Sequence, residues 1–259
     1  MEEKRLLHTN LCKKEIAKYC LLPGSPQRVE RIAKYLDKPK KVRVNREYET
    51  WSGYLAGEKV LVVSTGIGGP STAIAVEELA ELGAHTFIRI GSCATTCKDC
   101  KRGDVIIPQA SVRMEGTSLH YVSLEYPAVP TIELLDALRK AGETLKYPTK
   151  VGTVICRDLF YTQYDNVKQP ANYYIRPAFE SYKQMGAIAT EMETATLFIA
   201  GAKLGVRTGA CMVCATDYVP SKKVNKTYPI DYEPRAIEVG VEALKQIILN
   251  DKAQKKKSK

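Results

Sequence analysis

Short apolar runs alternate with helical patterns along nearly the whole chain, and this alternation limits the fold more than any other feature. Residues 60–63 are apolar at every position, as in a strand that is buried on both faces. A glycine-rich turn follows, and then Ala75, Leu79 and Leu82 recur at helical spacing. Strand, turn and helix in this order predict an α/β domain around a mostly parallel central sheet.

The same alternation predicts further elements on both sides of this unit. Strands are expected at residues 20–22, 86–90, 104–109, 151–156, 187–191 and 209–216, with extended chain at 43–56. Helices are expected at residues 26–36, 131–145, 173–185, 193–204 and 233–249. No linker, repeat or low-complexity segment interrupts the pattern, so residues 1–250 are interpreted as one domain. Residues 251–259 are interpreted as a disordered, lysine-rich tail.

Composition and cysteine usage narrow the class of protein. Hydrophobic residues make up 44% of the 259, which argues against disorder, and no apolar run approaches the ~18 residues of a membrane span. The first residues lead into polar sequence rather than the long apolar stretch of a signal peptide. Eight cysteines are too few for a disulfide scaffold of this length, and several lie in apolar segments. These features predict a soluble, cytoplasmic protein with reduced thiols.

The net charge of +10 raises the alternative of a non-catalytic, basic nucleic-acid-binding protein. Residues 251–259 hold five lysines and one acid, so the rest of the chain has 34 basic and 28 acidic residues and is only mildly basic. No pattern of interleaved aromatic and basic residues accompanies the lysines. We therefore expect no nucleic-acid partner; steep salt-dependent RNA binding without catalytic turnover would favour this alternative.

Four groups of residues that are suited to catalysis or ligand binding lie where predicted strands end. Ligands bind at this edge of open α/β sheets. They are Gly24 with Arg28, the turn at 66–69, Arg89, and Glu191 with Glu193. Each has a simpler interpretation as well. The first two are also typical of plain turns, and the turn at 66–69 matches neither a Walker motif nor the GxGxxG spacing.

Arg89 and the two glutamates are the more informative residues. An arginine in a strand that is buried on both faces needs a partner, so Arg89 is either half of an ion pair or an anion ligand. Glu191 and Glu193 share one face of an extended segment, which suits a metal site, a clamp on sugar hydroxyls or a helix cap. Together the four groups suggest an anion held beside a carboxylate that grips hydroxyls. No protein nucleophile is required if phosphate itself attacks a sugar.

Two CxxC pairs raise the question of a zinc site. Cys97 and Cys100 lie in a polar loop and suit a metal in principle. The apolar segment around Cys211 and Cys214 predicts a strand, in which side chains three positions apart point to opposite faces. Two ligands remain where a structural zinc site needs four, so no zinc is expected.

Several segments resemble the uridine phosphorylases of the nucleoside phosphorylase superfamily. They are the glycine-rich segment at 64–92, REYETW at 46–51, RMEGTS at 113–118 and EMETATL at 191–197, and the similarity runs from about residue 8 to residue 249. The resemblance implies a single α/β domain around a central mixed sheet, described as a distorted barrel and flanked by helices. It also implies nucleoside salvage by reversible phosphorolysis, with uridine as substrate and uracil and ribose 1-phosphate as products.

The resemblance assigns roles to residues at matching positions. Arg28, Arg89, Glu193 and Asp217 match catalytic positions. The phosphate-binding positions are Gly24, Arg28, Arg89 and Ser92, with Arg46 supplied by a neighbouring subunit. The ribose-binding positions are Met192 and Glu193, with His8 from that same neighbour. The base-binding positions are Ala94, Phe160, Gln163 and Lys168. A monovalent-cation site at a dimer interface, occupied by K⁺ in some members, matches Glu47, Ile67 and Ser71.

Departures from the family pattern cluster around the base. Lys168 falls where an arginine usually contacts uracil, Ala94 where glycine is usual, and Ser25 where aspartate is common. Asp217 stands where uridine-specific relatives usually have asparagine and purine-cleaving relatives have an aspartate that donates towards N7. Uridine is the expected substrate because an aromatic ring and an amide read a pyrimidine. A phosphorylase of 6-oxopurine nucleosides, or one with dual specificity, is the alternative.

The resemblance also fixes expectations about co-substrate and partners. Phosphate is the co-substrate and no cofactor is required. A homodimer forms the site, within a hexamer, and no membrane partner is expected. Related nucleosidases use water instead of phosphate, but a hydrolase needs no pocket with three arginines, which argues against that alternative.

Overall fold

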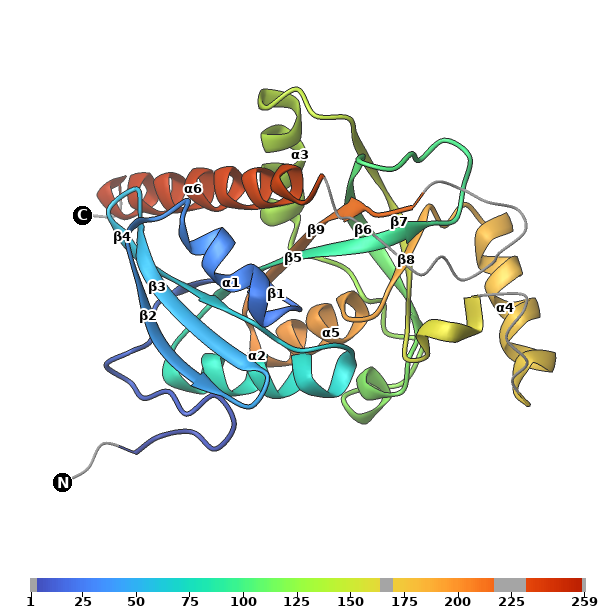
Figure 1. Cartoon of the computed structure of the whole chain (residues 1–259), viewed down its shortest axis with the longest axis horizontal. Helices are drawn as coiled ribbons and strands as arrows, with labels where there is room; N and C mark the ends of the chain where they lie inside the picture. Colours follow the sequence, from blue (N-terminus) through green and yellow to red (C-terminus); the bar gives the residue numbers. More distant parts are fainter. Residues whose placement is uncertain (1–3, 164–169, 217–231, 258–259) are drawn as a thin grey trace.

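A single mixed sheet of nine strands forms the centre of the protein (Figure 1). The structure is a computed structural model and describes residues 4–163, 170–216 and 232–257. The strand order is β2-β3-β4-β1-β5-β8-β7-β6-β9, and β5 also pairs with β9, which closes β5, β8, β7, β6 and β9 into a barrel. The strands are β1 (Tyr19–Pro23), β2 (Asp37–Asn45), β3 (Tyr48–Leu55), β4 (Glu58–Val63), β5 (Thr86–Thr95), β6 (Val105–Met114), β7 (Thr149–Arg157), β8 (Ala189–Glu191) and β9 (Arg207–Cys214).

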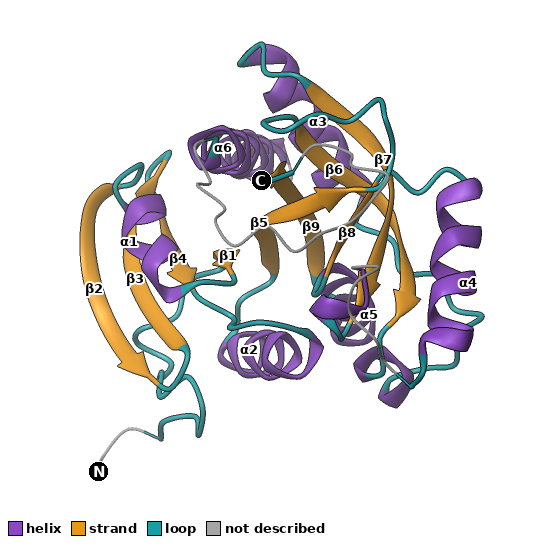
Figure 2. Ribbon diagram, turned by 45° about the vertical axis from the view of Figure 1, so that its right-hand side comes forward, coloured by secondary structure: helices purple, strands orange, loops and turns teal. Residues whose placement is uncertain are grey.

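Helices cover the sheet on both sides, with α3 and α6 packed together on one side and α2 and α5 on the other (Figure 2). The helices of the described residues are α1 (Pro26–Ala33), α2 (Gly69–Leu82), α3 (Ile132–Thr144), α4 (Asn172–Gln184), α5 (Thr194–Leu204) and α6 (Glu233–Lys257). Short 3₁₀ helices lie at Thr117–His120 and Phe160–Gln163. This arrangement confirms the predicted single α/β domain with a mixed, barrel-like sheet.

The two helical layers explain why the central strands are apolar throughout. In β5, Ile88 and Ile90 pack into one buried cluster that includes Leu244 of α6. Phe87 lies in a second cluster, which includes Val76 of α2 and Phe198 of α5. Both faces of the strand are therefore removed from water, and a charged side chain here needs a partner inside the protein.

Parallel pairing brings the carboxyl ends of four strands to one edge. β1 pairs in parallel with β4 and β5, and β5 pairs in parallel with β9. β2, β3 and β4, which include the extended chain predicted at 43–56, pair antiparallel, as do β5 with β8 and β6 with β9. The segments that follow β1 and β4 therefore meet beside the end of β5.

The C-terminal helix corrects one prediction. α6 continues to Lys257, so the interpretation of residues 251–259 as a disordered tail is wrong for residues 251–257. Asp251 accepts hydrogen bonds from Arg207 at 2.9 and 2.6 Å and from the Tyr19 hydroxyl at 2.9 Å. Lys252 donates to the Ala56 carbonyl at 2.6 Å. Lysine has good helix propensity, and these contacts extend the helix along the body of the protein.

In the described residues, none of the helices is both long enough and apolar enough to cross a membrane.

Candidate active site

Loops after β1 and β4 form one wall of the candidate site. The Thr65 N–H donates to the Pro23 carbonyl at 2.8 Å, and the Gly66 N–H donates to the Gly24 carbonyl at 3.0 Å. Leu22 is the register partner of Arg89, so β5 lies directly beside this wall. The sequence-predicted cluster of Gly24, the glycine-rich turn and Arg89 is therefore brought together.

Arg89 is buried, at 5% exposure, and its three guanidinium nitrogens have different surroundings. Nε donates to Glu191 at 3.3 Å, and Nη2 forms an ion pair with Glu193. Nη1 is buried with no hydrogen-bond partner among the described residues. Burial disfavours the charge on Arg89, but Glu193 and Glu191 outweigh this effect and raise its pKa.

The unpaired Nη1 of Arg89 faces the backbone of Gly24. A methyl group placed on Gly24 would lie 3.8 Å from Nη1 and 3.1 Å from the Gly66 carbonyl oxygen. A buried guanidinium donor without a partner costs about 1–3 kcal/mol, and more when it is charged. This donor is therefore suited to an anion that sits against Gly24.

Arg28 supplies a second buried cation next to Arg89. Its Nε forms an ion pair with Glu233, and its Nη1 donates to the Ile90 carbonyl at 3.2 Å. Glu233 also pairs with Arg31 at 2.5 Å. Burial lowers the pKa of Arg28, and repulsion from Arg89 and Arg31 lowers it further against the opposing effect of Glu233. Two arginines that repel each other inside the protein gain stability when an anion binds near both.

The two glutamates after β8 have separate roles. Glu191 accepts hydrogen bonds from the Glu193 N–H at 2.8 Å and from the Thr194 N–H and hydroxyl at 3.0 and 2.5 Å. It therefore caps the amino end of α5, which was the structural alternative for this pair. Glu193 instead accepts from the Gly68 N–H at 2.6 Å and pairs with Arg89.

Glu193 is a buried carboxylate with capacity for further hydrogen bonds. Burial raises its pKa, Arg89 opposes this, and the neighbouring Glu191 reinforces it. Its oxygens have more acceptor sites than the two contacts use, so it suits the hydroxyls of a sugar held between Arg89 and the glycine-rich turn. Met192, which is half-buried, lies between the two glutamates in sequence.

The RMEGTS segment supports the glycine-rich turn. A methyl group on Gly69 would lie 2.5 Å from the Thr117 Oγ1 atom and 2.6 Å from that of Thr196. Glu115 accepts from the Ser118 N–H at 2.9 Å and from the Thr196 hydroxyl at 3.1 Å. Only glycine fits at position 69, so the turn packs closely on α5 and this segment.

The three residues of the predicted cation site do lie together at the other side of the turn. Gly66 has a φ of +73°, and a methyl group there would lie 2.9 Å from Glu47 Cγ and 3.1 Å from Ser71 Oγ. The Ser71 hydroxyl donates to the Ile67 carbonyl at 3.2 Å. A carboxylate, a carbonyl and a hydroxyl oxygen are the ligand types that hard cations prefer, so the donor set fits a monovalent ion.

The predicted base-binding residues fall on β5 and on the segment after β7. Ala94 pairs in register with Thr190, and Ser92 lies two residues before it on β5. Phe160 is 39% exposed and packs edge-to-face on Tyr161, with ring centroids 5.4 Å apart. Gln163 ends this short helix, but its side chain lies outside the described part of the structure. Lys168 and Asp217 also lie outside the described residues.

Arg157 and Glu233 are site-supporting residues that the sequence analysis missed. Arg157 is buried, donates to the Thr190 hydroxyl at 2.9 Å and to the Leu159 carbonyl at 3.3 Å, and so holds the segment that carries Phe160. The sequence does contain a signal for Arg157, because a charged residue at the end of an apolar strand is unusual, as it is for Arg89. Glu233 lies 205 positions from Arg28, and no local pattern marks that pairing.

His8 lies beside Asn45, the residue that directly precedes Arg46. The Asn45 side chain donates to the His8 carbonyl at 2.7 Å, and His8 Nδ1 lies 2.8 Å from Glu78. Arg46 is exposed in the turn between β2 and β3. Among the described contacts, neither residue reaches Arg28, Arg89 or Glu193.

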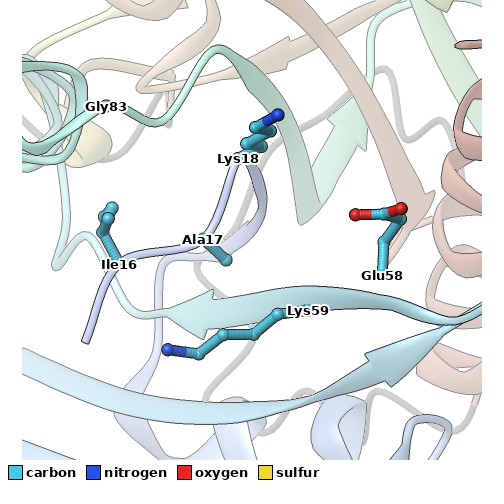
Figure 3. A pocket seen from close by; sticks show the side chains of 6 residues that line it. All are labelled: Ile16, Ala17, Lys18, Glu58, Lys59 and Gly83. Carbon is cyan, nitrogen blue, oxygen red and sulfur yellow. The ribbon is translucent and has the colours of Figure 1, made fainter. Parts of the chain in front are cut away.

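A separate surface pocket lies at the opposite ends of the strands. Its lining residues are Ile16, Ala17, Lys18, Glu58, Lys59 and Gly83 (Figure 3). Lys18 directly precedes β1, and Glu58 begins β4, so this pocket is at the amino ends of strands whose carboxyl ends carry Gly24 and Gly66. It contains none of the residues predicted to carry chemistry.

The cysteines show no metal centre. All eight are free thiols. In the part of the chain that the structure describes, no group of three or more His, Cys, Asp or Glu side chains is placed to hold a metal ion.

A mixed-sheet barrel with two buried arginines near the buried carboxylate of Glu193 defines an α/β protein whose site is suited to an anionic ligand. Comparison with known proteins gives the family. Residues 18–249 match the phosphorylase superfamily, and the chain belongs to this family.

Named relatives match over most of their length. The uridine phosphorylase of Treponema pallidum (strain Nichols) is 40% identical over 244 residues, which are 94% of this chain and 95% of that protein. The uridine phosphorylase of Escherichia coli (strain K12) is 38% identical over 253 residues, 96% of this chain and 100% of that protein. The guanosine phosphorylase of Halorubrum lacusprofundi is 36% identical over 203 residues, 78% and 79% of the two chains.

Proposed function

We propose that this protein is a uridine phosphorylase, which converts uridine and phosphate reversibly to uracil and ribose 1-phosphate. The observation that carries the proposal is the buried, unpaired Nη1 of Arg89, beside Gly24 and near the second buried arginine, Arg28. Similarity to uridine phosphorylases over nearly the whole chain supports the same reaction.

The residues of the site supply binding, orientation and charge rather than a nucleophile. Arg28 and Arg89 hold phosphate below the sugar, so that one phosphate oxygen attacks the anomeric carbon as the bond to the base breaks. Positive charge develops on the ribose, and the bound phosphate stabilises it. Glu193 accepts hydrogen bonds from the ribose hydroxyls and keeps the sugar in place. Paired guanidinium groups suit phosphate better than lysine because they donate in a fixed fork.

The residues that recognise the base of the nucleoside lie at the end of β5 and in the segment after β7. Phe160 offers a ring for the pyrimidine, and Gln163 offers an amide that donates to one carbonyl of uracil and accepts from N3–H. Purine nucleosides are the second candidate substrate class, because a guanosine phosphorylase is among the relatives. Asp217 is the residue that would serve a purine by donating to N7.

The complete site is built across a homodimer within a hexamer. Asn45 joins His8 to the turn that carries Arg46, and no described contact links either residue to Arg28, Arg89 or Glu193 of the same chain, which supports their serving a partner's site. A two-fold axis places each subunit's pair in the other's site. At the same interface, Glu47, Ile67 and Ser71 would hold a monovalent cation such as K⁺. Such a cation supplies positive charge that steadies the glycine-rich turn.

We place the reaction in the cytoplasm. The eight free cysteines support this, because thiols persist in reducing compartments.

A substrate panel tests the reaction. Uridine, thymidine, inosine and adenosine are incubated with the purified enzyme, with and without phosphate, and free base and sugar phosphate are quantified. We expect uridine cleavage that requires phosphate, at a kcat/KM at least about tenfold above that for inosine, since an unpaired buried polar group costs about 1–3 kcal/mol. Equal release of base without phosphate would identify a hydrolase, and a higher kcat/KM for inosine would overturn the choice of base.

Subunit mixing tests the shared site. Arg46→Ala and Glu193→Gln are each expected to be inactive alone. After denaturation and refolding together in equal amounts, half of the dimers are hybrids, and each hybrid has one intact site. About a quarter of wild-type activity should return. No recovery, or full activity in a monomeric preparation, would contradict a site built from two chains.

A further inference from the structure

Two cysteines face each other across neighbouring strands at the candidate site. Cys93 on β5 and Cys214 on β9 are register partners in the parallel pairing of these strands. The Ala215 N–H donates to the Cys93 carbonyl at 2.8 Å, which holds the two strand ends together. Neighbouring strands lie about 4.7–4.9 Å apart, and a disulfide needs Cα atoms about 4.4–6.8 Å apart. Register partners on these strands therefore fall within the range of Cα separations that a disulfide spans.

The two thiols hydrogen-bond to each other, and their pKa values shift in opposite directions. A hydrogen bond between them raises the pKa of Cys93, with burial adding to the effect, and the same bond lowers the pKa of Cys214 against the opposing effect of burial. Cys214 also bonds to the Thr216 carbonyl at 3.1 Å. Because the thiolate is the reactive form, the lowered pKa favours Cys214 as the thiol that is oxidised first and Cys93 as the resolving thiol.

A second pair of thiols packs into the same buried cluster. Cys97 and Cys100 hydrogen-bond to each other, and Cys100 lies in the same buried cluster as Cys93 and Cys214. Cys97 packs against that cluster and is partly exposed. The loop that carries them is tied to β9 by the Gly103 N–H, which donates to the Cys214 carbonyl at 2.9 Å. Four of the eight cysteines thus gather at one end of the barrel.

We propose that Cys93 and Cys214 are an oxidative modification site, which forms a reversible disulfide that inactivates the enzyme. The oxidant is a hydroperoxide such as hydrogen peroxide. It oxidises the Cys214 thiol to a sulfenic acid, and one water is released. The Cys93 thiol then attacks the sulfenic sulfur, the S–S bond forms and a second water leaves. A dithiol reductant reverses the modification by thiol–disulfide exchange.

The position of the pair links the disulfide to activity. Cys93 stands between Ser92 and Ala94, the predicted phosphate and base contacts, and Cys214 lies three residues before Asp217. An S–S bond of about 2.05 Å is much shorter than a thiol hydrogen bond, so its formation pulls both side chains out of their present positions and disturbs the residues beside them. A displacement of about 1 Å can lower the rate of an enzyme about 100-fold. This consequence rests on the proposed phosphorylase function, whereas the disulfide itself does not.

Peptide mapping tests the cross-link. The reduced full-length protein is treated with hydrogen peroxide, blocked with N-ethylmaleimide and digested with trypsin. Residues 90–98 and 208–222 are tryptic peptides, and each carries two cysteines. A Cys97→Ala/Cys211→Ala variant leaves only Cys93 and Cys214 in them, so a covalent pair of these peptides is unambiguous. We expect that pair in the variant and in the wild type, and its loss with dithiothreitol.

Activity is followed on the same samples. Oxidation should lower kcat/KM for phosphorolysis at least about tenfold, and dithiothreitol should restore it. Cys93→Ala and Cys214→Ala should each retain the activity of the reduced enzyme and resist peroxide, whereas Cys20→Ala, a buried thiol on β1, should remain sensitive.

The outcomes separate this inference from the proposed function. Sulfinic acid at Cys214 without a cross-link, or a Cys97–Cys100 disulfide in its place, would overturn the modification site. A cross-link that leaves turnover unchanged would overturn the switch. If the reduced enzyme has no phosphorylase activity, the proposed function fails, and the peptide map still decides whether the disulfide forms.

Discussion

Replacement of Gly24 by alanine isolates the anion pocket from the rest of the site. The added methyl group would lie 3.8 Å from Arg89 Nη1, in the space where the structure leaves that donor without a protein partner. It would also lie 3.1 Å from the Gly66 carbonyl oxygen, so the turn must shift by only a few tenths of an ångström. Both ion pairs of Arg89 remain, which makes this substitution cleaner than removal of the arginine.

The size of the effect follows from the hydrogen bond that is blocked. A hydrogen bond to a charged group contributes about 1.5–3 kcal/mol. Since each 1.4 kcal/mol corresponds to a factor of ten, kcat/KM for phosphate should fall about 10- to 150-fold. The KM for the nucleoside should change far less, because Glu193 and Phe160 are not displaced. Arg89→Ala, by contrast, would leave Glu191 and Glu193 buried without their cation, at a cost of about 3–5 kcal/mol in stability.

Steady-state kinetics with phosphate and uridine varied separately provide the measurement, together with thermal unfolding. Gly116→Ala is the matched control, because Gly116 has an ordinary φ of −89° and a methyl group there would meet only Asp158, at 3.6 Å. The control should retain wild-type kinetics. Unchanged phosphate kinetics in Gly24→Ala, or an equal loss for both substrates, would refute the assignment of this space to phosphate.

Three further predictions concern stability. Burial opposes ionisation of Glu15, but hydrogen bonds from Arg5, Arg43 and Cys12 outweigh it and lower its pKa to about 2. The ionised Glu15 stabilises the protein fully above its usual pKa of 4.5, and this stabilisation is lost as the pH falls to about 2. The difference in unfolding free energy between wild type and Glu15→Gln should therefore shrink over that range. A constant difference in urea titrations would contradict this. Removal of residues 251–259 should lower Tm by about 2–4 °C, because the contacts of Asp251 with Arg207 contribute about 1 kcal/mol. Removal of residues 253–259, which keeps Asp251, should leave Tm nearly unchanged. Equal Tm values for the two truncated proteins in calorimetry would show that the Asp251 contacts contribute nothing. Gly69→Ala should destabilise the protein by about 1–3 kcal/mol because the methyl group would overlap Thr117 and Thr196, and an unchanged urea midpoint would show that the turn can move aside.

Local sequence patterns are sufficient to predict the class of fold. A strand covered by helices on both sides must be apolar at every position, so the central strands and the alternation with helices can be recognised without the structure. The same rule makes Arg89 conspicuous, because a charge in such a strand needs a partner. The closure of the barrel is different: it depends on β5 pairing with β9, whose register partners Thr86 and Arg207 are 121 positions apart.

The candidate site, like the fold, is predicted in part by local sequence and decided in part by tertiary contacts. The chain by itself marks Gly24, Arg28, Arg89 and the Glu191–Glu193 pair as unusual, because glycine and charge at strand ends serve few purposes other than turns and ligands. It cannot distinguish the two glutamates, which have identical side chains two positions apart. The tertiary structure decides that Glu191 caps α5 and Glu193 meets Arg89, since the chain direction at the end of β8 sets where each carboxylate points. It alone also decides which donor of Arg89 stays unpaired, because Glu191, the acceptor for Nε, lies 102 positions away in the sequence.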